Sequence, residues 1–190
     1  MTIIFSEPGR GFKSIEDRLL KSFKKVIRSD SYILGKNVEI FENKITNFLN
    51  PKGHFVSCAS GTDAITLAIL SLDIKAGSKI LVPSHTAPAS IIGIRNAKCI
   101  PIYVDIEKDT PLISIDEIIN AINKTKIDAI LIVHLYGMGV NVNKLKKLIN
   151  NRDIKIIEDC SQSFGTKIYG HQSGTIGNSG TFSFFPTKNL

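Results

Sequence analysis

The stretch that decides the fold runs from Ile156 to Leu190 and reads IIEDCSQSFGTKIYGHQSGTIGNSGTFSFFPTKNL. An apolar run ends in an acid, Asp159. A glycine-rich loop follows, then a short aromatic strand, T-F-S-F-F, and then Lys188. Open α/β sheets bind ligands in the crevice at the carboxyl ends of their strands. We therefore expect Asp159 and Lys188 to project into one crevice.

An acid and a lysine in this arrangement are what a pyridoxal phosphate (PLP) site needs. The lysine forms the Schiff base, and the acid keeps the pyridine nitrogen protonated so that the ring can accept electrons. Plainer interpretations stay open for both residues. An aspartate at a strand end often caps a helix or anchors a loop, and a single lysine is usually a solvated charge.

Composition narrows the classes of protein that fit. The chain has 190 residues, 43% of them hydrophobic, which is typical of a globular domain. Its net charge is +7, but the lysines are scattered over helical stretches without an aromatic and glycine signature. This favours a solvated surface, with a mild bias toward phosphorylated ligands, over nucleic-acid binding.

The cysteines and the N-terminus indicate where the protein works. Cys58, Cys99 and Cys160 are odd in number and far apart, and each lies in or beside an apolar run. We expect buried thiols in a reducing cytoplasm rather than disulfides or a zinc site. No signal-peptide core and no apolar run long enough for a bilayer are present, which predicts a soluble protein without membrane contact.

Hydrophobic spacing predicts two amphipathic helices, residues 15–27 and 37–49, followed by an alternation of strands and helices. The predicted strands are 54–58, 79–83, 99–104, 128–135 and 155–159. The predicted helices between them are 62–72, 87–95, 114–122 and 143–149, the third opened by a capping box of Ser114 and Glu117. Strands this apolar indicate a parallel sheet covered by helices on both faces. We divide the chain into a helical lead, residues 1–35, and an α/β domain, residues 36–190.

Three further features fall at the ends of predicted strands. Ser60, Gly61 and Thr62 form a turn into a helix, which suits a phosphate but also an ordinary capped turn. His85 could lie over a cofactor ring, and His134 could face the same crevice, although a lone histidine is more often structural. Histidines and cysteines this dispersed predict no metal site. Because all these candidates fall at carboxyl ends of strands, they support one another.

Six stretches together resemble the PLP-dependent nucleotide-sugar aminotransferases of the DegT/DnrJ type. They are L-G-K-N-V-E-I-F-E, S-G-T-D-A-I-T-L-A-I, V-P-S-H-T, V-H-L-Y-G, I-E-D-C-S-Q-S-F-G and F-S-F-F-P-T-K-N-L, in the family's order from Leu34 to Leu190. The resemblance implies the large domain of the aspartate aminotransferase-like fold (PLP fold type I), incomplete at its C-terminal end and lacking the small domain. It also implies a homodimer.

The resemblance assigns a role to each matching residue. Lys188 bonds PLP covalently, Asp159 pairs with the pyridine nitrogen, Gln162 hydrogen-bonds on the 3-hydroxyl side, and His85 stacks on the ring. The phosphate is held by Gly61, Thr62 and Ser183. The implied reaction is transamination of a keto sugar on a nucleotide carrier, with glutamate the expected amino donor and Lys188 moving the proton as base and acid. The match of P-S-H-T leans toward 3-keto sugars.

Two alternatives accompany this prediction. Relatives that are PLP-dependent sugar dehydratases carry histidine in place of the lysine, so Lys188 argues against that activity. Family chains are about twice as long, so the chain could instead be a non-catalytic, truncated or split-gene fragment. In the family fold the strand after the lysine pairs with the first strand. We therefore expect the predicted strand 54–58 to lack that neighbour, and the 190 residues alone to be incompetent in catalysis.

Overall fold

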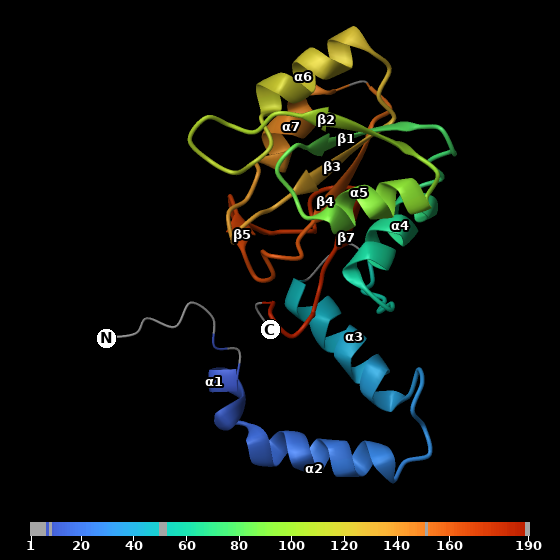
Figure 1. The fold of residues 1–190 in the computed structure, drawn as a ribbon, viewed down its shortest axis with the longest axis vertical. Coiled ribbons are helices and arrows are strands. Elements are labelled where there is room, and N and C mark those ends of the chain that lie inside the picture. The colour runs from blue at the N-terminus through green and yellow to red at the C-terminus, as the bar shows by residue number, and fades with distance from the viewer. Residues whose placement is uncertain (1–6, 8, 50–52, 151, 189–190) are drawn as a thin grey trace. The chain divides into compact units, whose positions relative to one another are not determined.

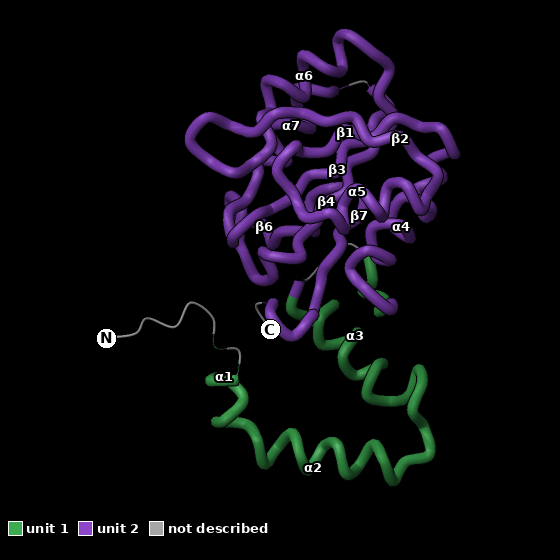
Figure 2. Tube along the Cα trace, viewed as in Figure 1, with its two compact units in different colours: residues 1–48, 53–57 green, residues 49–52, 58–190 purple. Residues whose placement is uncertain are grey.

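The computed structural model describes residue 7 and residues 9–49, 53–150 and 152–188. The chain divides into two compact units, shown in different colours in Figure 2. Unit 1 comprises residues 1–48 and 53–57, and unit 2 comprises residues 49–52 and 58–190.

Unit 1 is helical. Its helices are α1 (Gly9–Lys13), α2 (Glu16–Ile27) and α3 (Lys36–Leu49, whose last residue belongs to unit 2), and the last two confirm the predicted ones. The apolar face of α2 is largely exposed: Leu19 and Phe23 are 46% and 62% accessible. In α3, Phe41 instead packs edge-to-face on Phe55, with ring centroids 5.8 Å apart.

Unit 2 is built on a parallel sheet of five strands in the order β2-β1-β3-β4-β7 (Figure 1). Its strands are β1 (Lys79–Pro83), β2 (Ile100–Val104), β3 (Ala129–Val133), β4 (Lys155–Asp159) and β7 (Ser179–Thr181). A small antiparallel pair, β5 (Lys167–Ile168) and β6 (His171–Gln172), lies in the loop before β7. The central strands β1, β3 and β4 are almost wholly buried, as strands covered on both faces must be.

Four helices cover this sheet, and alternation of side chains along the strands creates two apolar cores. The helices are α4 (Gly61–Ser71), α5 (Pro88–Asn96), α6 (Ile115–Lys124) and α7 (Val142–Leu148). Leu131 and Ile157 pack with residues of α4 and α5, whereas Ile132 and Ile156 pack with residues of α6 and α7. The predicted α/β architecture with helices on both faces is confirmed.

The helix starts are fixed by short side chains. The Ser60 hydroxyl accepts a hydrogen bond from the N–H of Asp63 at 3.1 Å and caps α4. The Ser114 hydroxyl accepts one from the N–H of Glu117 at 3.3 Å and caps α6, which confirms half of the predicted capping box. The reciprocal bond is not formed, because the N–H of Ser114 bonds to the carbonyl of Asp105 at 3.0 Å. No helix in the described part of the chain is long and apolar enough to span a bilayer.

The predicted strand 54–58 is wrong. This segment is irregular, and its backbone donors bond to side chains of α3 instead of a neighbouring strand: the N–H of Phe55 bonds to Thr46 at 3.0 Å, and that of Ser57 to Glu42 at 2.7 Å. The expectation of three buried thiols fails at the end of this segment, because Cys58 is exposed while Cys99 and Cys160 are buried. A residue outside the sheet is not covered by it.

The aromatic strand also needs correction. Its parallel pairing with β4 covers Ser179–Thr181, so the strand ends where the aromatic residues begin. Phe182 is buried, and Phe164 packs edge-to-face on both Phe182 and Phe184, at 5.9 and 5.4 Å between ring centroids. The aromatic residues therefore cover the end of the sheet rather than extend it.

Candidate cofactor site

Asp159 is the last residue of β4 and is 5% exposed, with its side chain on the face that α4 and α5 cover. Two donors hold the carboxylate. The N–H of Ser161 bonds to Oδ1 at 3.0 Å, and the Ser90 hydroxyl bonds to Oδ2 at 3.3 Å. Hydrogen bonds to both oxygens fix the plane of a carboxylate, which an acid that must meet one ring nitrogen requires.

Ser90 links Asp159 to the loop that carries His85. Its side chain is fully buried in α5, and its oxygen lies 2.8 Å from the hydroxyl of Thr86. The segment that begins S-H-T after β1 is thereby tied to the end of β4. Ser90 was not predicted as a site residue, although its position four residues after Thr86 puts the two hydroxyls on one face of the helix start.

The predicted phosphate residues Gly61 and Ser183 lie against each other. A Cβ atom at Gly61 would stand 3.2 Å from Cβ and 3.5 Å from the hydroxyl oxygen of Ser183, and 3.6 Å from the hydroxyl of Ser161. Two hydroxyls therefore meet the first residue of α4. Ser161 was missed because its position becomes apparent only once β4 and α4 are packed together.

The first backbone N–H groups of α4 belong to the same site as these two hydroxyls. The N–H of Asp63 is taken by the Ser60 hydroxyl, and the N–H of Ala64 by the Ser60 carbonyl at 2.9 Å. The N–H groups of Gly61 and Thr62 make no hydrogen bond within the described ranges. Helix starts with free N–H groups favour anions, because donors and dipole act together.

His85 and Gln162 approach each other through Tyr136. The Nε2 atom of His85 lies 3.5 Å from the Tyr136 hydroxyl, and the two rings are 6.3 Å apart. The amide oxygen of Gln162 accepts the N–H of Tyr136 at 3.3 Å, and its carbonyl accepts the N–H of Gly137 at 3.0 Å. The side-chain amide nitrogen of Gln162 has no acceptor among the described residues, so it can donate to a ligand.

The backbone of Tyr136, in the loop after β3, must be stabilised by its surroundings. Its φ of 56° lies in the left-handed region, which costs a non-glycine residue free energy that the surroundings must offset. The two hydrogen bonds to Gln162 and one from the Thr166 hydroxyl to the carbonyl of Gly137, at 3.2 Å, provide that support. V-H-L-Y-G was predicted to lie at a strand end, but Tyr136 was not predicted to have a role.

Lys188 lies in a turn five residues after Ser183. Its N–H bonds to the carbonyl of Phe185 at 2.8 Å, and its side chain is partly exposed. The ammonium group forms no ion pair with the residues that the structure describes. A lysine without a fixed acidic partner is available for covalent chemistry.

His134 does not face this crevice, contrary to expectation. It is fully buried and its Nε2 atom lies 2.9 Å from Oε2 of Glu158. The reason is the alternation of the strand: Ile130 and Ile132 point to the core under α6 and α7, so His134 does too. Counting in twos along the predicted strand would have given the correct side.

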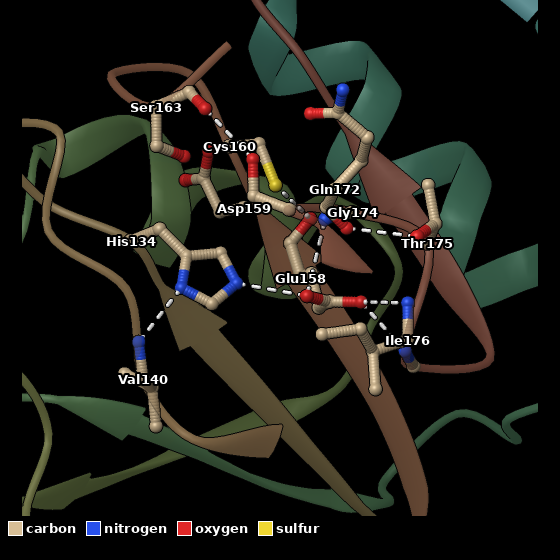
Figure 3. Close-up of polar contacts among 12 residues, drawn as sticks. His134, Val140, Glu158, Asp159, Cys160, Ser163, Gln172, Gly174, Thr175 and Ile176 are labelled. Atoms are coloured by element: carbon tan, nitrogen blue, oxygen red, sulfur yellow. Dashed lines mark hydrogen bonds and ion pairs between the residues drawn. The ribbon is translucent and has the colours of Figure 1, made fainter. Parts of the chain in front are cut away.

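The buried cluster also bears on metals. The histidines and cysteines were predicted to be too dispersed for a metal site, yet the fold brings ligand atoms of His134, Glu158 and Cys160 within 4.8 Å of one another. Both nitrogens of the histidine and both oxygens of the glutamate are already hydrogen-bonded, as Figure 3 shows. The lone pairs that a metal needs are therefore in use, and the cluster is a hydrogen-bonding centre.

The groups at the sheet edge fit PLP. Backbone N–H groups and hydroxyls around a glycine that leaves a cradle for a ligand suit a phosphate, and an oriented carboxylate suits a protonated pyridine nitrogen. Fold and site together define the class of PLP-dependent enzymes with the aspartate aminotransferase-like fold. Within that class, the chain belongs to the DegT/DnrJ/EryC1/StrS aminotransferase family, whose model matches residues 13–190.

Individual relatives support this assignment. The chain is 36% identical over 180 residues to the UDP-N-acetyl-3-dehydro-alpha-D-glucosamine 3-aminotransferase of Acidithiobacillus ferrooxidans, covering 94% of this chain and 48% of that protein. The structure of this chain resembles the crystal structure of S. venezuelae DesV, with a TM-score of 0.92 and 31% sequence identity. The match covers 99% of this chain and 50% of that one. The chain thus spans about half the length of the relatives it matches.

A dehydratase has the same fold. The E. coli GDP-4-keto-6-deoxy-D-mannose-3-dehydratase with bound hydrated PLP superposes with a TM-score of 0.79 and 29% identity, covering 87% of this chain and 44% of that one. PLP is therefore bound by a dehydratase of this fold as well as by aminotransferases. The fold alone does not separate aminotransferases from dehydratases.

Proposed function

We propose that this chain carries the PLP-binding part of a nucleotide-sugar aminotransferase that acts on a keto sugar, with glutamate as amino donor. The observation that carries the proposal is the meeting of Gly61, Ser161 and Ser183 at the start of α4, close to the strand end that presents Asp159. A phosphate cradle and an oriented acid at one sheet edge are the two fixed points of a PLP site.

Each residue has a distinct part in this proposal. The N–H groups of Gly61 and Thr62 and the hydroxyl of Ser183 bind the phosphate. Lys188 bonds the cofactor, and Asp159 holds the proton on the pyridine nitrogen.

Two more residues orient the ring. His85 lies over its face, and the amide nitrogen of Gln162 donates to the 3-hydroxyl side. When bound, PLP supplies the electron sink for breaking a bond at the donor α-carbon.

Lys188 also acts as base and acid. With PLP and donor bound, the Nζ atom of Lys188 would take the proton from the donor α-carbon as a base and later give it up as an acid. An amine with no competing ion pair among the described residues suits this role. The dehydratases that resemble this family carry histidine in place of the lysine, so Lys188 favours transamination.

The proposed substrate rests on fewer observations than the proposed cofactor. The similar protein of A. ferrooxidans is named as a 3-aminotransferase of a UDP-linked 3-dehydro sugar. Together with P-S-H-T after β1, this supports a 3-keto sugar nucleotide over a 4-keto one. We propose that the whole protein works as a homodimer and that residues 36–190 belong to its large domain, with residues 1–35 as a helical lead.

The test is a substitution of the lysine in the protein at its full natural length. The wild type should bind PLP with an absorbance band at the edge of the visible range and convert glutamate to its keto acid. Lys188→Ala should lose both the band and the conversion. Lys126→Ala should keep them, because Lys126 is exposed and precedes β3, at the sheet edge opposite the site. An unchanged spectrum in Lys188→Ala would refute the assignment.

A further inference from the structure

Glu158 is a fully buried acid for which the proposed reaction has no use. Its Oε1 atom accepts the N–H groups of Ile176 at 2.8 Å and Gly177 at 2.6 Å, and its Oε2 atom accepts the N–H of Gly174 at 3.1 Å and lies 2.9 Å from Nε2 of His134 (Figure 3). Burial alone would raise the pKa of Glu158. Hydrogen bonds from His134, Gly177 and Gly174 outweigh burial and hold the pKa below its ordinary value.

The ring of His134 is fixed in one orientation. The N–H of Val140 donates to Nδ1 at 3.1 Å, so the hydrogen sits on Nε2 and points to Glu158. The carboxylate of Glu158 therefore receives four donors, three of them from the backbone of the loop before β7. A charged acceptor with this many donors holds the loop firmly, because charge-assisted hydrogen bonds are about twice as strong as neutral ones.

The loop that Glu158 holds packs closely against β7 and the residue that follows it. Gly174 has a φ of 82°, and a Cβ atom there would collide with the ring of Phe182 and approach Sγ of Cys160 at 3.0 Å. A Cβ atom at Gly180, in β7, would collide with the carbonyl group of Gly174. A shift of the loop is thus passed directly to β7 and to the aromatic residue that follows it.

The same strand carries the phosphate hydroxyl. In the pairing of β4 with β7, Glu158 stands opposite Gly180, and the N–H of Cys160 bonds to the carbonyl of Thr181 at 2.8 Å. Ser183 follows two residues later, beside Gly61. A continuous set of contacts therefore runs from the Glu158 carboxylate through the loop to Ser183.

We propose that Glu158 is a positioning residue of the cofactor site: it sets where Ser183, and beyond it Lys188, stand relative to Asp159. Glu158 and Asp159 are consecutive in β4 and so point to opposite faces of the sheet. One carboxylate holds the loop behind the sheet while the other faces the cofactor. This inference rests on the proposed function, since it concerns the same site.

Glu158→Gln tests the inference with little change in shape. Glutamine replaces one acceptor oxygen by an NH₂ group. In one orientation this group faces the backbone N–H groups of Ile176 and Gly177. In the other it faces the N–H of Gly174 and the ring N–H of His134. Two buried donors then lose their acceptor. Glu117→Gln, the same replacement on the exposed surface of α6, is the matched control. Glu158→Asp, which keeps the charge on a shorter side chain, is the conservative variant.

Two quantities are measured on the full chain: amide hydrogen exchange in the PLP-free protein and the PLP dissociation constant. In Glu158→Gln we expect exchange at residues 174–183 to quicken and PLP binding to weaken, each by roughly tenfold, because buried donors are left unpaired. Glu158→Asp should show smaller changes of both kinds and replaces Glu158→Gln if that variant does not fold. The control should match the wild type.

Two results would overturn the proposal: unchanged exchange at residues 174–183, or faster exchange with PLP affinity equal to that of the wild type. Failure of the proposed function gives a different pattern, in which the wild type and the control bind no PLP. Exchange at residues 179–188 then decides. Faster exchange there in Glu158→Gln supports the positioning role, and an unchanged rate refutes it.

Discussion

At the scale of a single residue, replacing one atom of Asp159 or of its hydrogen-bond donors should change the chemistry of the site most. The carboxylate is oriented by the N–H of Ser161 and the hydroxyl of Ser90, and Ser90 is in turn bonded to Thr86. An acid in such a setting can keep a pyridine nitrogen protonated only while it carries its charge. Removing the charge without changing the shape separates this role from simple packing.

Asp159→Asn should therefore leave PLP bound but slow proton removal from the donor by about 100-fold or more, the usual size of a lost acid or base function. The measurement is keto-acid formation from glutamate in a single turnover, with cofactor occupancy followed by absorbance. Asp153→Asn, which changes an 89% exposed acid paired with Lys155, should behave as the wild type. A near-normal rate in Asp159→Asn would remove Asp159 from the catalytic set.

Other residues of the site show what sequence reasoning could reach. Asp159 and Gly61 were predicted from strand and helix ends, where chain direction alone decides which edge a residue reaches, whereas Ser183 came only from the family resemblance. Ser90 and Glu158 were missed, because their roles depend on which elements pack against β4 and not on spacing along the chain.

At the scale of elements, prediction succeeded where a segment's own pattern determines its structure. Strands β1 and β4 were predicted to the residue, since buried parallel strands are continuous apolar runs. Residues 54–58 have a similar pattern but form no strand, because a strand needs a partner and their donors bond to Thr46 and Glu42. The end of β7 was misplaced for a related reason: pairing with β4, not aromatic content, decides where it stops.

The cap of α6 tests whether a local hydrogen bond fixes the residue at which this helix begins. Ser114→Ala removes the acceptor of the Glu117 N–H and should lower the free energy of unfolding by about 1 kcal/mol, the usual value of an N-cap. Urea unfolding followed by circular dichroism measures this. Ser78→Ala, which removes a hydroxyl with no hydrogen bond in the described ranges, is the control. Equal stabilities of the two variants would show that packing alone fixes the start of α6.

At the scale of the whole molecule, the chain supplies one edge of a sheet, which is only part of the proposed catalytic site. It spans about half of the relatives it matches, so sugar recognition and the dimer remain proposals about the whole protein. What the chain itself contains is a sheet whose two faces are both polar at the end of β4, with Asp159 on one and Glu158 on the other. Stability and PLP affinity should therefore respond to Glu158, and the rate of proton removal from the donor to Asp159.

The pH dependence of stability should reveal Glu158. Its pKa in the folded protein lies below the ordinary 4.5, so its stabilisation is fully present above about pH 4.5 and is lost as the pH falls through the lower, folded value. At neutral pH, Glu158→Gln should be less stable than the wild type by about 2 kcal/mol. Denaturant unfolding at a series of pH values should show this gap narrowing toward pH 3. A gap that stays constant or widens on acidification would contradict the charged, hydrogen-bonded state of Glu158.

The central claim is that PLP is held covalently at Lys188, and peptide mapping tests it most directly. The PLP-loaded protein is reduced with borohydride, which makes the bond permanent, and is digested with trypsin. The claim predicts the added mass of reduced PLP on the peptide that begins after Lys167 and runs through an uncleaved Lys188. PLP on a different lysine, or no modified peptide from a protein that has bound the cofactor, would contradict it.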